Sequence, residues 1–259
     1  MNPVTLYRIT GAVKRPSMSL LFLTLLIGIC AARAPALESP LPWINAIREE
    51  AGVRHVEPDP VLALAAERWA SVLADNGTLS HRGADGSAAL DRCRAAGGTE
   101  AHVGEILGAG PTLAAVEKGW LQSGEHRALA LGPSWTHVGW GKSRRGGSEV
   151  WVVVFCERLV AGLTLERGPG GLLIGGRLLI SGPGTPLLYS GLDPVQPQSW
   201  DPLNRAFVFL VSDEILAGYL RLGFLSPGGG FRLTNAFTLP PGMEYPEGSS
   251  RSSASAASP

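Results

Sequence analysis

The sequence predicts an α+β fold: a helix-rich segment followed by strands, with a second unit made only of strands after it. Three observations support this prediction. Residues 42–131 carry apolar side chains at helical spacing, between signals that start and stop helices. Residues 135–156 change to short apolar runs typical of strands, and helical periodicity almost disappears after residue 160. The 259 residues are enough for one large domain or two modest ones.

The helix-rich segment has recognisable helix ends. Pro42 suits the first position of a helix that Gly52 ends. Asp59 can cap a second helix, and Asn76-Gly77 can stop it. Further helices are expected over 87–95, 112–122 and 123–131, and the first strands over 135–141 and 149–156.

The region from 161 to 240 is expected to form a small all-β domain, either a sandwich or a barrel. Turns rich in Gly and Pro, such as Gly182-Pro183-Gly184, separate about six short apolar runs. The expected strands cover 163–167, 172–181, 186–189, 206–212, 219–225 and 231–239. Residues 241–259 are rich in Ser, Ala and Pro, a composition typical of a disordered tail.

Residues 1–36 have the pattern of a secretory signal peptide. Basic residues precede an apolar run that ends near Ala32, and Ala34-Pro35-Ala36 fits a cleavage site. The run is short for a transmembrane helix, so we expect cleavage, with an uncleaved anchor as the alternative. We therefore expect a secreted, periplasmic or cell-surface protein with no membrane span beyond the signal peptide.

Charge and cysteine content narrow the expected function. The chain has 22 basic and 22 acidic residues, and loss of the signal peptide's four basic residues leaves a net charge of −4. No basic stripe is present, so nucleic-acid binding is not expected. Export makes a disulfide between Cys93 and Cys156 one alternative, and two buried free thiols are the other.

Three short segments, 79–81, 102–106 and 120–127, concentrate polar residues and supply His81, Glu105 and His126. Two imidazoles and one carboxylate can bind a divalent transition metal and leave coordination positions for water. They can also act in general acid–base catalysis. Spacing alone does not bring them together, because more than twenty residues separate each from the next. A local hydrogen bond is the other explanation for each histidine.

Other candidate residues have weaker signals. His137 lies in an expected strand, His102 lies in a loop, and His55 has no expected partner. A serine nucleophile is not indicated, because the sequence has no Gly-x-Ser-x-Gly elbow and Ser123 is explained as a helix cap.

The order of motifs over residues 42–158 resembles the CAP family, especially its short bacterial members. This family comprises cysteine-rich secretory proteins, antigen 5 and pathogenesis-related 1 proteins, and its defining unit is also called the SCP domain. The matching motifs are, in chain order, Asn45 and Arg48, Leu79-Ser80-His81, Gly104-Glu105, Trp120, Ser123-Gly124-Glu125-His126-Arg127 and Val138-Gly139-Trp140-Gly141. No single motif is specific for the CAP family, whereas the set of motifs in this order is.

The resemblance implies an α-β-α sandwich with His81, Glu105 and His126 on the floor of a shallow cleft. Paired histidines bind zinc or a similar cation in some members, so His81 and His126 are the expected metal ligands, with Glu105 as a further candidate. The sequence departs from the family at two positions, and each departure removes a polar side chain from the expected cleft. Ile106 stands where the family has Asn, and Ser123 stands where larger members have a second Glu.

The resemblance favours a secreted binding or interaction module over residues 37–160. Its expected ligand is a divalent cation such as zinc, or an extracellular lipid, glycan or protein. The β domain would add a second surface or act as a spacer. The alternative is a zinc-dependent hydrolase, a protease or a cell-wall hydrolase, in which Glu105 activates a metal-bound water. The family has no shared reaction, so no residue is assigned as catalytic, and a purely structural domain is a third reading.

Overall fold

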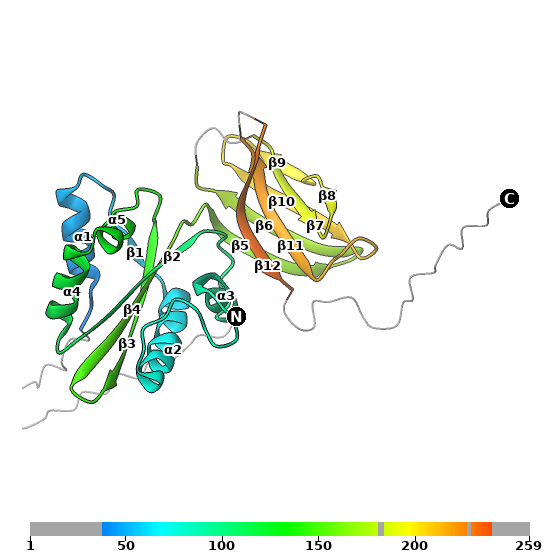
Figure 1. Ribbon diagram of the computed structural model, residues 1–259. Helices are drawn as coiled ribbons and strands as arrows, with labels where there is room; N and C mark the ends of the chain where they lie inside the picture. The colour runs from blue at the N-terminus through cyan, green and yellow to red at the C-terminus, as the bar shows by residue number, and fades with distance from the viewer. Residues whose placement is uncertain (1–37, 181–183, 227–228, 240–259) are drawn as a thin grey trace, which may run out of the picture. The chain divides into compact units, whose positions relative to one another are not determined.

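The computed structural model describes residues 38–180, 184–226 and 229–239 (Figure 1). The expected signal peptide and the expected disordered tail lie outside these residues. The predicted fold class is confirmed, because helices and a sheet come first and strands alone follow. None of the helices in the described part of the chain is both long and apolar enough to span a membrane.

A four-stranded sheet with the order β1-β3-β4-β2 forms the middle layer of the helix-rich part. Its strands are β1 (Glu57–Pro58), β2 (Val103–Gly110), β3 (His137–Arg145) and β4 (Ser148–Cys156). β4 pairs antiparallel with both neighbours, and β1 adds a short parallel pairing to β3. Strand β2 was not expected from the sequence, and it lies at an edge of the sheet.

Helices cover both faces of this sheet, with α2 and α3 on one face and α1, α4 and α5 on the other (Figure 1). Their bounds are α1 (Leu41–Glu50), α2 (Pro60–Asn76), α3 (Ala89–Ala95), α4 (Leu113–Gln122) and α5 (Gly124–Ala130). The expected end signals hold for α2. The Asp59 carboxylate accepts a hydrogen bond from the Leu62 amide at 2.8 Å, and Gly77 ends the helix with a φ of 72°.

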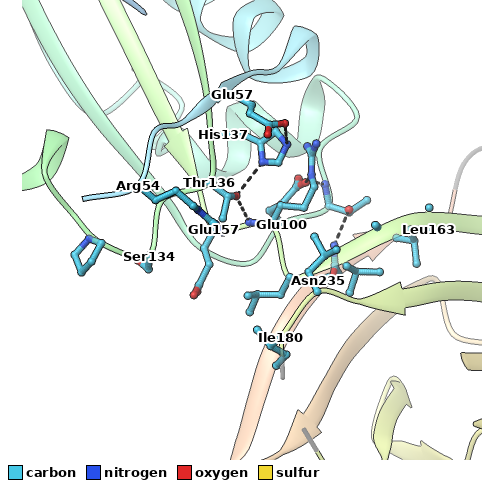
Figure 2. Close-up of a pocket in the computed structure, with 18 of the residues that line it drawn as sticks. Arg54, Glu57, Glu100, Ser134, Thr136, His137, Glu157, Leu163, Ile180 and Asn235 are labelled. Atoms are coloured by element: carbon cyan, nitrogen blue, oxygen red, sulfur yellow. Dashed lines mark hydrogen bonds and ion pairs between the residues drawn. The ribbon is translucent and has the colours of Figure 1, made fainter. Parts of the chain in front are cut away.

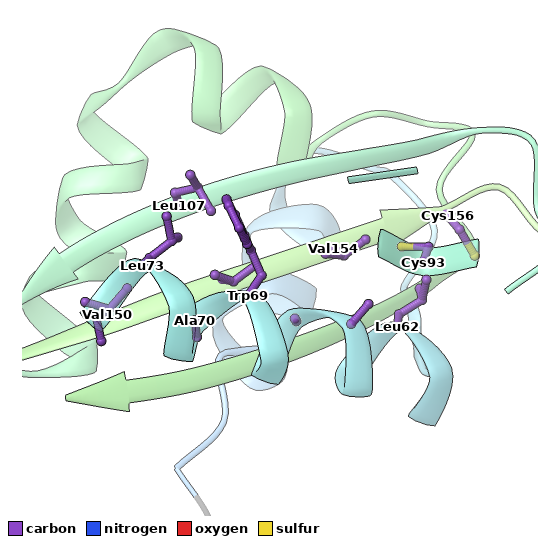
Figure 3. Close-up of a cluster of buried hydrophobic side chains, with 13 residues drawn as sticks. Leu62, Trp69, Ala70, Leu73, Cys93, Leu107, Val150, Val154 and Cys156 are labelled. Atoms are coloured by element: carbon purple, nitrogen blue, oxygen red, sulfur yellow. The ribbon is translucent and has the colours of Figure 1, made fainter. Parts of the chain in front are cut away.

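Alternation along β4 gives the sheet two separate apolar cores. Val152 and Val154 face α2 and α3, whereas Trp151 and Phe155 face α1 and α4. All four side chains are buried. Figure 3 shows the first core, in which Trp69 of α2 lies over the strands. The three layers are therefore an α-β-α sandwich.

Two glycines of β3 let α2 lie directly against the sheet. A Cβ atom on Gly139 would lie 2.1 Å from the Ala63 nitrogen, and one on Gly141 would lie 2.2 Å from the Glu67 nitrogen. Real Cβ atoms do not approach backbone this closely, so a side chain at either glycine would push the helix away. This contact fixes the position of α2 and therefore the start of the loop that follows it.

The strands after residue 159 form two four-stranded sheets with the orders β5-β6-β10-β9 and β12-β11-β7-β8. Their bounds are β5 (Val160–Gly168), β6 (Gly171–Leu178), β7 (Pro186–Ser190), β8 (Asp193–Val195), β9 (Ser199–Asp201), β10 (Ala206–Ser212), β11 (Tyr219–Leu225) and β12 (Phe231–Thr238). One core is built from both sheets, so of the two expected architectures this is a sandwich rather than a closed barrel.

The two cysteines of the described residues are free thiols, the second of the two expected alternatives. Both are buried at one end of the core that faces α2 (Figure 3). Burial, together with the nearby Glu105 charge, raises the pKa of the Cys93 thiol to about 12. Burial also raises the pKa of Cys156. Neither is a reactive thiolate at neutral pH.

Candidate functional site

The candidate site is built around Glu105 on the edge strand β2. Alternation along this strand places Ile106 in the core on the α1 and α4 side, and Leu107 in the core on the α2 side. Glu105 therefore faces the α2 side, where only 8% of it is exposed. A carboxylate at such a position needs partners that compensate its lost hydration.

Glu105 has two such partners, and they use both of its oxygens. The Oε1 atom lies 2.8 Å from Nδ1 of His81, and the Oε2 atom accepts a hydrogen bond from Nη2 of Arg92 at 2.7 Å. The Arg92 side chain is itself nearly buried, whereas the imidazole of His81 is 59% exposed. The buried carboxylate of Glu105 thus contacts both Arg92 of α3 and the exposed imidazole of His81.

The loop that carries His81 is held by contacts that the sequence did not suggest. The indole Nε1 of Trp69 donates to the Ser80 carbonyl at 3.2 Å. The Arg92 guanidinium stacks 4.0 Å from the centre of the Trp69 ring and donates to the Ser87 carbonyl at 3.0 Å. The sequence analysis missed Arg92. Nothing in the sequence of the short helix α3 shows which of its basic residues will contact Glu105, thirteen residues later.

The contact with Glu105 also determines which ring nitrogen of His81 carries the proton and which one is left free to bind a ligand. Because an ionised carboxylate only accepts hydrogen bonds, the imidazole nitrogen beside it must carry the proton. We therefore assign the proton of neutral His81 to Nδ1. The other nitrogen, Nε2, then has a free lone pair on an exposed ring, the state in which a histidine binds a metal or accepts a ligand's hydrogen bond.

His126 lies in the first turn of α5, and the expected cap is present there. Ser123 Oγ accepts a hydrogen bond from the His126 amide at 3.4 Å. Burial lowers the pKa of the half-buried His126 imidazole, and the charge of His81 lowers it further, against an opposite effect of Glu125. The His81 imidazole is thus near enough to affect the pKa of His126.

The remaining histidines lie elsewhere. His55 is exposed and lies 3.6 Å from Glu49, and His102 is exposed. His137 begins β3 and contacts Thr136. Ile106, which stands where the family has Asn, is fully buried on the opposite face of β2 from Glu105. Its side chain therefore packs in the core instead of supplying an amide.

Among the described residues, no three His, Cys, Asp or Glu side chains are arranged to hold a metal ion. His81 and His126 could supply two imidazole ligands, and water would have to complete the coordination. Glu105 fits the position behind His81 rather than a position on the ion, because both of its oxygens are already hydrogen-bonded. This donor set suits a reversibly bound cation better than a catalytic zinc, which usually has three protein ligands.

The α-β-α sandwich is the architecture that the CAP resemblance implied, and within it the side chains of His81 and Glu105 are in contact. Residues 43–156 match the model of the cysteine-rich secretory protein family, CAP. This part of the chain is therefore a CAP domain, as the sequence analysis predicted. No curated protein matches the chain.

Solved structures of bacterial proteins resemble part of the chain. An outer surface protein of Borrelia burgdorferi is 24% identical, with a TM-score of 0.43, over 46% of this chain and 89% of that one. An extracellular SCP-domain protein of Bacillus anthracis is 23% identical, with a TM-score of 0.42, over 46% of this chain and 39% of that one. A cysteine-rich secretory protein of Staphylococcus aureus is 18% identical, with a TM-score of 0.37, over 46% and 37%.

Proposed function

We propose that this chain is an exported binding protein whose CAP domain holds a divalent cation at His81 and His126. The signal-peptide pattern of residues 1–36 supports the export. The observation that carries the binding site is the pairing of His81 Nδ1 with Glu105 at 2.8 Å. In this role Glu105 orients His81 and makes the lone pair of its Nε2 atom a better ligand for the cation.

The contact between a carboxylate and the far nitrogen of an imidazole is a recurring feature of metal-binding histidines. The carboxylate fixes the ring's orientation and tautomer and raises the basicity of the nitrogen that binds the ion. Arg92 holds the second oxygen of Glu105 and stacks on Trp69, so the carboxylate has little freedom to turn toward an ion itself. The bound cation would in turn offer open positions to an acidic or carbonyl-bearing extracellular ligand.

The same contacts weigh against the zinc-dependent hydrolase considered from the sequence. That mechanism needs a free carboxylate to take a proton from metal-bound water. Glu105 is buried, and both of its oxygens are already hydrogen-bonded. Binding without turnover is therefore the function that the site supports best.

We expect the purified chain to bind one zinc or cobalt ion, measured by isothermal titration calorimetry. His81→Ala and His126→Ala should each remove most of the affinity. Glu105→Gln should weaken it by about 10-fold to 100-fold, because the ring then loses its charged orienting partner. Titration of a chelator into the loaded protein should reverse the binding.

His55→Ala is the matched control, because His55 is exposed and its only ion-pair contact among the described residues is Glu49. It should bind zinc as the unchanged chain does. Circular dichroism checks that each variant is folded. Loss of affinity in His55→Ala, or undiminished affinity in both His81→Ala and His126→Ala, would place the metal elsewhere and refute the proposal.

A further inference from the structure

A cavity of about 1140 Å³ lies around Glu57, His137 and Asn235 (Figure 2). Acidic and basic side chains both line it, so its chemistry selects neither an anion nor a cation. A smaller hollow, of about 370 Å³, lies within the CAP domain between α2 and α3, and we refer to it as the α2–α3 groove. Its volume is sufficient for a small organic molecule, and its walls are more selective.

One face of α2 forms the first wall of the α2–α3 groove. Helical spacing places four of its side chains on that face, and they are Ala65, Arg68, Trp69 and Val72. The opposite wall comes from the loop 83–87 and from α3, where Arg92 and Ala95 line the groove. Small side chains keep the hollow open, because an alanine stands on each wall.

Two planar side chains, Trp69 and Arg92, determine what kind of apolar body fits the groove. The Arg92 guanidinium stacks 4.0 Å from the centre of the Trp69 ring, and both residues line the groove. Nη1 of Arg92 donates to the Ser87 carbonyl at 3.0 Å, and Nη2 donates to Glu105 at 2.7 Å, so this planar pair is held in place. Aromatic rings pack favourably against indole rings and guanidinium planes. The walls therefore favour an aromatic ligand.

Arg68 determines the charge that such a ligand should carry. It is exposed and has no hydrogen-bond or ion-pair partner among the described residues. Asp85 also lines the groove, but the Ser87 amide donates to its Oδ1 atom at 2.9 Å within its own turn. Hydrogen bonds from Ser87 lower the pKa of Asp85, so it is a carboxylate at pH 7. Of these two charges, the cation is the one that lacks a partner, and a guanidinium suits an anionic ligand.

We propose that the α2–α3 groove binds an aromatic carboxylate, whose ring packs against Trp69 and Arg92 and whose carboxylate pairs with Arg68. A guanidinium can bind a carboxylate through two parallel N–H donors, which fixes the orientation of the ligand. The groove contains neither His81 nor His126, so the proposal and its test do not depend on the cation site.

The test uses the full chain without metal and phenylacetate as the probe, with binding followed by protein NMR. Phenethylammonium and cyclohexylacetate are the comparison compounds, since the first reverses the charge and the second replaces the aromatic ring by a saturated one. Phenylacetate should give saturable shifts at the Trp69 indole and at Arg68. Phenethylammonium should give none, and cyclohexylacetate should bind about threefold more weakly or worse, because it lacks the aromatic contacts.

Substitutions of the two charged residues test the sign of the ligand's charge. Arg68→Gln should weaken phenylacetate binding by about twofold to fivefold, the effect of losing an exposed ion pair. Arg54→Gln is the matched control, because it removes another exposed arginine that lies outside the groove, and it should leave the affinity unchanged. Asp85→Asn should strengthen binding, because it removes a negative charge from the groove and asparagine can keep the turn.

Ala95→Trp should fill the groove and abolish binding. Arg68 is exposed, so Arg68→Gln remains informative even if Ala95→Trp fails to fold. Four results would each overturn the proposal: no saturable binding of phenylacetate, equal binding of phenethylammonium or cyclohexylacetate, equal affinities for Arg68→Gln and Arg54→Gln, or weaker binding by Asp85→Asn.

Discussion

Arg48→Met is expected to lower the free energy of unfolding by about 3 kcal/mol or more. Arg48 is completely buried, and its guanidinium donates to four backbone carbonyls. The shortest of these hydrogen bonds joins Nη1 to the Ala130 carbonyl at 2.6 Å. Methionine would keep the apolar stem and leave buried carbonyls without a donor.

This arginine also matters to the candidate site. Ala130 ends α5, the helix that carries His126, and Arg48 ties that end to α1. Urea unfolding followed by circular dichroism measures the effect, with the exposed neighbour Arg54→Met as control. A loss below about 1 kcal/mol, or an equal loss in both variants, would show that the guanidinium network does not hold α5.

Trp120→Ala is expected to destabilise the chain by about 3–5 kcal/mol. Trp120 is 2% exposed, and its indole Nε1 donates to the Leu107 carbonyl of β2 at 2.7 Å. Its ring centre lies 5.7 Å from that of Trp43, so one side chain joins α4, α1 and the edge strand. Removing it leaves a large cavity behind the strand that carries Glu105.

Trp120→Phe separates the hydrogen bond from the packing. It keeps most of the ring and loses the bond to Leu107, so we expect a smaller loss of about 1–2 kcal/mol. The same urea experiment compares the two variants. Equal destabilisation by Ala and Phe would contradict the assignment of most of the effect to packing.

The sequence predicted the elements whose signals are local. The cap at Asp59 and the stop at Gly77 are each visible in a few residues, and in the structure α2 begins and ends at these signals. It did not predict β2, because glycines at 104, 108 and 110 interrupt the apolar pattern of that strand. These glycines have helices and Trp135 packed against them, which sequence periodicity does not reveal.

The candidate site was only partly predictable. His81 and Glu105 were named on the order of the family's motifs, and the structure places their side chains in contact. The role of Arg92 could not be predicted, since it depends on where α3 lies relative to Trp69 and the edge strand. The β8 and β9 strands were missed because three residues are too few to show alternation.

The central claim is that Glu105 fixes the proton on Nδ1 of His81 and leaves Nε2, together with His126, to bind a cation. Long-range ¹H–¹⁵N NMR spectra of the labelled chain, recorded with and without zinc, test this directly. We predict a protonated Nδ1 in His81 before zinc is added, and zinc-dependent shifts at Nε2 of His81 and at the imidazole of His126. A proton on Nε2 of His81 in the metal-free chain, or zinc shifts confined to other histidines, would contradict the claim.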